Sequence, residues 1–128
     1  MLFRSGYGTN ELPAFYTRQS GFGVDYRIDT PEELAAVFKA SNEMGLKSGM
    51  LVTNPIPEEY AMPLSTINAA IDQAIAECNA KGIKGKETTP FLLARVAEIT
   101  GGDSLASNIR LVFNNAKVAA LTAVEFCK

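Results

Sequence analysis

The chain has 128 residues, a formal net charge of −2 and an apolar content of 47%, which is the size and composition of a single soluble domain. It contains no histidine, which excludes Ser–His and Cys–His catalytic pairs and zinc–histidine sites. Basic residues are scattered and no apolar run is long enough to span a bilayer, so we expect neither nucleic acid nor a membrane as a partner.

The two cysteines, Cys78 and Cys127, are far apart and match no metal-binding or disulfide motif. We therefore expect two free thiols, as in a cytoplasmic protein. No charged-then-apolar leader begins the sequence, so secretion is not expected.

The first segment combines a glycine-rich turn, an aromatic cluster and one strand. The turn covers residues 6–10, and no helix or strand is predicted before it. Phe15 and Tyr16 are typical of core positions, with ligand contact as the less favoured alternative. Residues 23–28 alternate between apolar and charged side chains, which predicts a half-exposed strand.

The next segment is predicted to be a helix that ends at Gly45. Thr30 and Pro31, followed by two glutamates, form a capping box with proline at the first helical position. The glutamates complement the helix dipole, so we do not expect them to be catalytic groups. The expected buried face consists of Leu34, Val37, Phe38 and Met44.

Residues 49–53 are an apolar run that predicts a buried strand, and residues 54–59 hold two prolines that make a stiff extended loop. In open α/β sheets, ligands bind at the carboxyl ends of strands. Asn54, Glu58 and Glu59 are therefore candidate pocket residues, although a rigid loop with solvated acids is the favoured alternative.

A further helix is predicted from Ser65, as its cap, to the neighbourhood of Gly82. Residues 82–86 loosely resemble a phosphate-binding loop. A P-loop follows a strand and places Ser or Thr directly after its lysine; here a helix precedes the loop, and a plain basic linker is favoured.

The C-terminal third is predicted to be two helices joined at a glycine pair. Thr88-Thr89-Pro90 begins the first helix, and residues 101–102 end it as a left-handed cap would. The second helix starts at residues 103–104 and continues to Val124.

That second helix carries an apolar stripe whose small members would let another backbone approach closely. Asn108 and Asn115 lie seven residues apart at one border of the stripe. A buried amide must have hydrogen-bond partners, so each asparagine either cross-links to a loop or strand end, which is the favoured alternative, or reaches a ligand. The members of the stripe are Leu105, Ile109, Val112, Ala116, Ala119 and Ala123.

The order strand, helix, strand and three helices predicts an α/β fold, with a mixed sheet flanked by helices in an α/β/α arrangement. We expect residues 1–128 to form one helix-rich unit. No recognisable catalytic set is present, and the residue pattern by itself names no reaction.

Four blocks of sequence do point to a family. They resemble, in order and spacing, the C-terminal part of the pseudouridine-5′-phosphate glycosidases, also called the indigoidine synthase A family. The blocks are Gly-Tyr-Gly-Thr with Pro-Ala-Phe-Tyr-Thr-Arg at residues 6–18, Asn-Pro-Ile-Pro-Glu-Glu at 54–59, Thr-Pro-Phe-Leu-Leu at 89–93, and Thr-Gly-Gly with Ser-Leu, Asn-Ile and Asn-Asn-Ala within 100–116.

The resemblance implies reversible cleavage of the C–C glycosidic bond of pseudouridine 5′-phosphate to uracil and ribose 5-phosphate. It implies a divalent metal, typically Mn²⁺, a lysine that forms an imine-type adduct with the sugar, and a glutamate that moves protons. A C–C glycoside has no basic leaving oxygen, so two-carboxylate hydrolysis does not serve, whereas a lysine adduct supplies an electron sink. The resemblance further implies a homo-oligomer, a trimer for the full-length family.

The family's lysines, glutamate and metal-binding aspartate precede the Gly-Tyr block, so we assign no catalytic residue and no metal ligand in this chain. Asn108 matches a family asparagine expected to face the sugar-phosphate pocket, and Asn115 and Asn54 are weaker substrate-binding candidates. We expect the C-terminal portion of the glycosidase, inactive as this chain alone. The alternative is a truncated, non-enzymatic relative that serves as a binding or oligomerisation domain.

Overall fold

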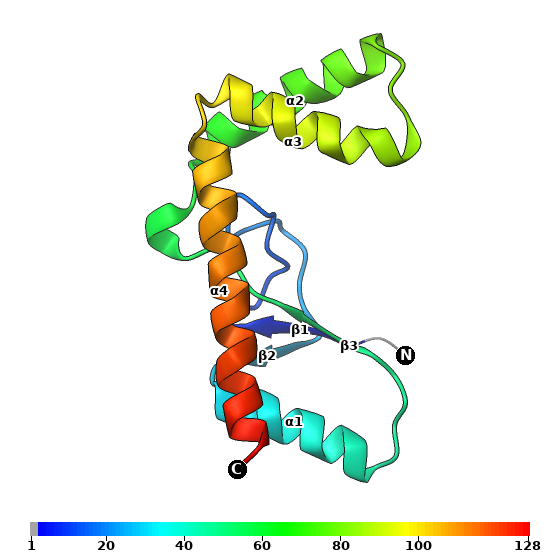
Figure 1. Cartoon of the computed structure of the whole chain (residues 1–128), viewed down its shortest axis with the longest axis vertical. Coiled ribbons are helices and arrows are strands. Elements are labelled where there is room, and N and C mark those ends of the chain that lie inside the picture. The colour runs from blue at the N-terminus through cyan, green and yellow to red at the C-terminus, as the bar shows by residue number, and fades with distance from the viewer. Residues whose placement is uncertain (1–2) are drawn as a thin grey trace.

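A three-stranded parallel sheet in the order β2-β1-β3 is the framework of the structure, a computed structural model that describes residues 3–128 (Figure 1). β1 (Phe3–Tyr7) is the central strand, between β2 (Tyr26–Ile28) and β3 (Met50–Thr53). The register places Ser5 opposite Tyr26 on one side and Val52 on the other.

The predicted α/β class is confirmed. The described strands pair only in parallel, so the mixed pairing expected from the sequence is not seen among them, apart from one isolated antiparallel bridge between Glu11 and Gly23. Both connections between successive strands are long enough to return the chain in the same direction: residues 8–25 join β1 to β2, and a segment with the helix α1 (Pro31–Glu43) joins β2 to β3.

The strand β1 corrects the expectation that nothing regular precedes the glycine-rich turn. Its residues Phe-Arg-Ser-Gly-Tyr have little of the β-branched character that marks strands. Pairing on both sides stabilises it instead. Gly6 is buried, and a Cβ on it would overlap the carbonyl oxygen of Thr9, so this position requires glycine.

The capping of α1 is confirmed. Thr30 Oγ1 accepts a 3.1 Å hydrogen bond from the amide of Glu33, whose carboxylate accepts one of 2.8 Å from the amide of Asp29. Gly45 follows the helix with a φ of 68°. Met44, predicted to be buried, is 72% exposed because it lies beyond the last helical residue, at the cap.

Helices α2 (Leu64–Ala80) and α3 (Thr88–Ile99) form a hairpin at one end of the molecule (Figure 1). Both caps differ from prediction. α2 begins one residue before Ser65, and a short 3₁₀ turn, η2 (Gly85–Glu87), leads directly into α3, so Thr88 begins the helix without a side-chain cap. A small core between the hairpin and Tyr16 includes Ile67, Ala70, Ala74 and Val96.

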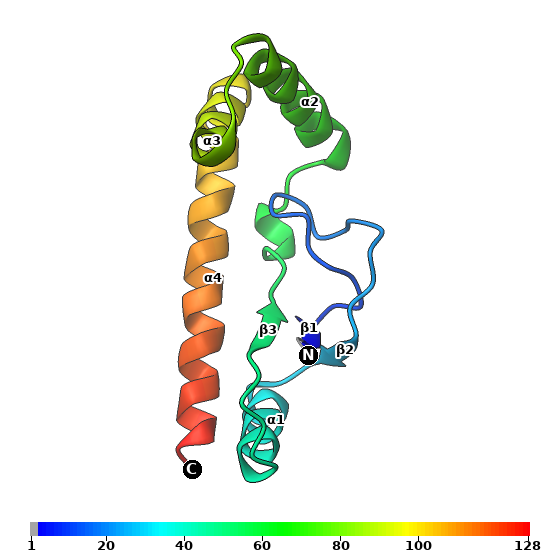
Figure 2. The same ribbon diagram turned by 90° about the vertical axis from the view of Figure 1, so that its right-hand side faces the viewer.

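Helix α4 (Asp103–Phe126) runs from this hairpin to α1, and the C-terminus lies beside α1 (Figure 2). Gly101 and Gly102 have φ values of 63° and 96°, which confirms the predicted left-handed break between the helices. The second core lies at the α1 end, where Ile28, Leu34 and Val118 are buried together.

The N-terminal part of the predicted apolar stripe of α4 does not face the protein, whereas Ala119 and Ala123 line a cavity between α4 and α1. Leu105, Ile109 and Val112 are 54%, 46% and 56% exposed. The helix instead buries a face that is rich in hydroxyl groups, comprising Ser104, Ser107, Leu111, Val118 and Thr122. Helical periodicity is therefore confirmed, but the face that packs inward is the other one.

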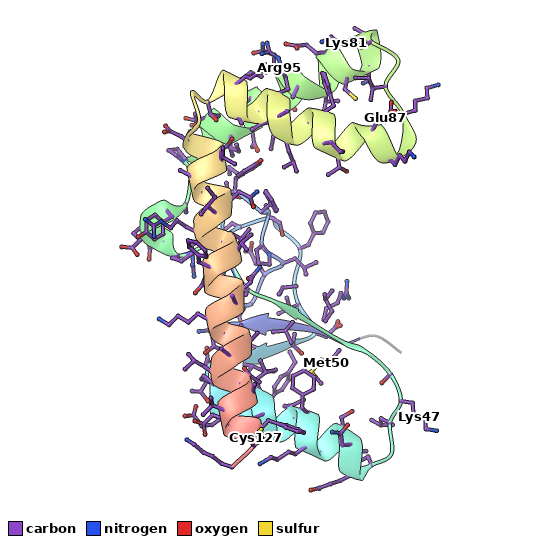
Figure 3. The ribbon with its side chains drawn as sticks, viewed as in Figure 1. Lys47, Met50, Lys81, Glu87, Arg95 and Cys127 are labelled. Carbon is purple, nitrogen blue, oxygen red and sulfur yellow. The ribbon has the colours of Figure 1, made fainter. Side chains whose placement is uncertain are left out.

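Cys78 is buried and Cys127 is exposed, and both are free, as predicted. Cys127 lies at the end of α4 beside α1, far from the hairpin that carries Lys81 and Arg95 (Figure 3). Between residues 3 and 128, the structure contains no helix with the length and apolar character needed to cross a membrane.

Candidate functional site

A cavity of about 870 Å³ lies between α1, the carboxyl end of β3 and the C-terminal half of α4. Val52, Thr53 and Asn54 form the wall at the strand end, and the loop that follows β1 contributes Pro13 and Phe15. The position agrees with the general rule that ligand sites in parallel sheets lie at the carboxyl ends of strands.

Two of the three asparagines singled out in the sequence meet in this cavity. Asn54 and Asn115 both line it, and Nδ2 of Asn54 donates a 3.0 Å hydrogen bond to Oδ1 of Asn115. Asn115 thus makes the cross-link to a strand end that was one of its two predicted roles. The pairing leaves Oδ1 of Asn54 and Nδ2 of Asn115 available to a ligand.

Asn108 lies elsewhere on the same helix. It is partly buried and is not among the residues that line the cavity. Seven residues correspond to about 10 Å along a helix, so Asn108 is roughly two turns away from Asn115. The structure brings together Asn54 and Asn115, but not Asn108.

The proline-rich segment after β3 is held along α4 by residues that the sequence did not single out. Nδ2 of Asn114 donates a 3.3 Å hydrogen bond to the carbonyl of Pro55, and Oγ of Ser107 donates one of 2.9 Å to the carbonyl of Tyr60. The guanidinium of Arg110 lies 4.9 Å from the centre of the Tyr60 ring. One sequence signal could have predicted these contacts. Ser107, Arg110 and Asn114 are polar and lie three and four positions apart, which places them on one face of a helix.

This contact explains why Ser107 and Asn114 of α4 are turned toward the loop. A segment with Pro55 and Pro57 cannot pair as a strand, so its carbonyl groups need other donors. The hydroxyl of Ser107 and the amide of Asn114 supply those donors. The segment includes the 3₁₀ turn η1 (Glu58–Tyr60), in which Glu58 and Glu59 are exposed and lie outside the cavity lining.

The aromatic pair Phe15 and Tyr16 divides between core and cavity. Tyr16 is 6% exposed and packs in the hairpin core, as predicted, and burial raises the pKa of its hydroxyl. Phe15 lines the cavity with a φ of 66°, a left-handed conformation that costs a non-glycine residue about 1–3 kcal/mol. The two rings meet edge to face, with centroids 4.7 Å apart.

The polar groups of the cavity lining are uncharged. Among the described residues, its lining holds amides, hydroxyls, one thiol and many apolar groups, with no carboxylate or amine. Within residues 3–128 there is also no group of three or more His, Cys, Asp or Glu side chains that could hold a metal ion. The donors present here do not fit the divalent metal that the resemblance implies.

The loop at residues 82–86 lies at the far end of the α2/α3 hairpin, away from this cavity. Between the two helices of the hairpin, Arg95 on α3 makes a forked ion pair with Glu77 on α2, with contacts of 2.6 and 2.9 Å. This pair and the amide of Gln73 hold the pKa of Glu77 down to about 2. The link that these charged residues make between the two helices explains their presence without a bound phosphate.

The fold and the cavity define an α/β protein with a cavity at the carboxyl end of a parallel strand. Residues 2–125 match the family model described as "Indigoidine synthase A like protein". The chain belongs to this family.

Known relatives agree with this assignment. The chain is 61% identical, over 96% of its length, to a pseudouridine-5′-phosphate glycosidase of Clostridium botulinum, of which it covers 40%. It is 59% identical, over 94% of its length, to a pseudouridine-5′-phosphate glycosidase of Escherichia coli, of which it covers 39%. The crystal structure of an indigoidine synthase A-like protein from Thermotoga maritima superposes on 99% of the chain with a TM-score of 0.83 at 36% identity, over 41% of its own length. The prealnumycin C-glycosynthase AlnA, in complex with ribulose 5-phosphate, gives a TM-score of 0.78 at 29% identity over 99% of this chain and 43% of its own.

The chain thus spans about two fifths of the length of the relatives it matches, and this stretch is the C-terminal part of the family sequence.

Proposed function

We propose that this chain forms the C-terminal part of a pseudouridine-5′-phosphate glycosidase, which cleaves its substrate reversibly to uracil and ribose 5-phosphate. The observation that carries the proposal is identity of 48–61% to eight proteins of that name, over 92–96% of this chain.

Within that enzyme, the chain would supply one wall of the substrate site. Asn54 and Asn115 retain a free acceptor and a free donor at the cavity, which suit the hydroxyl and phosphate groups of a sugar phosphate. Asn108, two turns away, is proposed as a further substrate contact. The relative solved with ribulose 5-phosphate supports a sugar phosphate as the ligand class.

The covalent chemistry is proposed to reside in the part of the family domain that this chain does not span. There, a lysine would form the imine-type adduct with the opened sugar, a glutamate would move protons, and an aspartate would bind Mn²⁺. The role left to this chain is to bind and orient the substrate, since its described cavity lining carries no carboxylate or amine. We further propose a cytoplasmic homotrimer as the assembled form.

A chimeric enzyme tests this proposal. The N-terminal three fifths of the Clostridium botulinum relative would be joined to this chain, which would replace the segment to which it is 61% identical. We expect the chimera to release uracil from pseudouridine 5′-phosphate in the presence of Mn²⁺, and the chain alone to release none above a buffer blank. A folded chimera without activity would contradict the proposal and favour the non-enzymatic alternative.

A further inference from the structure

The outer face of α4 is an extended apolar surface that nothing in the described structure covers. We define it by six exposed residues at helical spacing: Leu105, Ile109, Val112, Phe113, Ala116 and Val124. At about 100° per residue, this sector of the helix contains no charged side chain. Folded monomers rarely leave contiguous apolar patches of this kind uncovered, and such patches mark interaction sites.

The edge of the sheet next to α4 is open as well. Among the described strands, β3 pairs only with β1, and its sequence Met-Leu-Val-Thr has no proline or charge that would protect a free edge. The opposite edge, β2, is protected by Arg27, which makes a 2.7 Å ion pair with Asp29. A further strand therefore has one suitable edge, β3.

These two features form one continuous surface. The cavity has the end of β3 as one wall and α4 as another, and its lining includes Ala119 and Ala123. Helical spacing places these two alanines in line with Val112 and Ala116 of the outer face. The cavity thus leads from the carboxyl end of β3 to the outer face of α4.

The total accessible surface area indicates how much surface of the chain is available for contact with a partner. The chain exposes 8168 Å², about 1,500 Å² more than the ~6,600 Å² expected of a compact monomer of its mass. A standard protein interface buries about 800 Å² on each partner, so the excess is large enough for an extensive, stable interface.

We propose that the outer face of α4 and the edge of β3 are the docking surface for the remaining three fifths of the family domain, and that this part binds there even as a separate polypeptide. The relatives indicate what binds to this surface. In the Thermotoga maritima protein, the segment that superposes on 99% of this chain is only 41% of the polypeptide, so more than half of that protein lies outside the matching segment. The proposal rests on family membership and not on the reaction, so assembly rather than activity tests it.

The chimera with the Clostridium botulinum relative is rebuilt with a protease site at the junction. After cleavage, we expect the two pieces to elute as one equimolar complex in size-exclusion chromatography with light scattering. Hydrogen exchange at the amides of residues 51–53 should be slower in that complex than in the chain alone, because β3 gains a neighbouring strand.

Ile109→Asp should weaken the cleaved complex at least tenfold, because it places a charge in an apolar contact. The matched control is Ile75→Asp on α2, where the isoleucine is 42% exposed, against 46% at Ile109; this variant should leave the complex intact.

Three results would overturn the proposal: separation of the wild-type pieces after cleavage, failure of the chimera to fold, or equal effects of the two substitutions. A stable homo-oligomer of the chain alone that Ile109→Asp disrupts, with no binding of the other piece, would overturn it too and assign the surface to a second copy. An assembled complex without glycosidase activity would support this proposal and contradict only the proposed function.

Discussion

The side-chain amide of Asn54 donates a 3.0 Å hydrogen bond to Oδ1 of Asn115, which joins the end of β3 to the middle of α4 across a separation of 61 residues. The neighbouring residues repeat the link, since Asn114 donates to the carbonyl of Pro55. Two consecutive residues of the loop are thus held by two consecutive residues of the helix. This arrangement sets the orientation of both amides that line the cavity.

The amide pair should show measurable coupling in a double-mutant cycle. We expect Asn54→Ala and Asn115→Ala, made in the chimera, to be non-additive by about 0.5–1 kcal/mol in the free energy of unfolding, the net worth of one hydrogen bond that is not fully buried. Urea denaturation measures it. Asn68→Ala, an exposed asparagine on α2, should be additive with either variant, and additivity of the Asn54 and Asn115 variants would show that the hydrogen bond contributes nothing.

Asn108→Ala tests the proposed substrate contact. If its amide binds the sugar or phosphate, the chimera should lose roughly tenfold to a hundredfold in kcat/KM, or about 1.5–3 kcal/mol, with little change in Tm. Kinetics and thermal unfolding of the same samples check this. A lowered Tm with normal kinetics would make Asn108 a purely structural amide.

Gly6→Ala should destabilise the chain by about 1–3 kcal/mol, because its Cβ would overlap the carbonyl of Thr9 and crowd Val24, 3.1 Å away, inside the central strand. Gly23→Ala is the matched control, since its Cβ would meet nothing nearer than 3.9 Å. Urea midpoints of the two variants provide the comparison. Equal midpoints would mean that β1 adjusts freely at Gly6.

The ion pair between Glu77 and Arg95 should make stability fall in acid. The pKa of Glu77 is about 2 in the folded chain and 4.5 ordinarily, so between these values the unfolded state binds more protons. The stabilisation is complete above about pH 4.5 and is lost as the pH falls toward 2. Thermal unfolding across this range should show a shallower decline for Glu77→Gln and for Arg95→Gln; an unchanged slope in Glu77→Gln would contradict this assignment.

The sequence by itself determined the features that depend on near neighbours. The cap of α1 could be predicted from the sequence because Thr30 accepts its hydrogen bond from the amide of Glu33, only three residues away. The break between α3 and α4 could be predicted from Gly101 and Gly102, because a left-handed backbone conformation favours glycine wherever it occurs. The family was readable as well, since its motifs are contiguous blocks.

Only the tertiary structure decided which surfaces meet. Residues 3–7 contain no β-branched residue and hold a glycine, yet form the central strand because neighbours pair on both sides. Periodicity showed that α4 has an apolar and a polar face but not which one packs inward. A mixed face does so, because Val118 packs in the core with Ile28 and Leu34, while Asn114 and Ser107 supply hydrogen-bond donors to the carbonyls of Pro55 and Tyr60. Such contacts join residues 47 to 61 positions apart, and no local pattern encodes a partner at that distance.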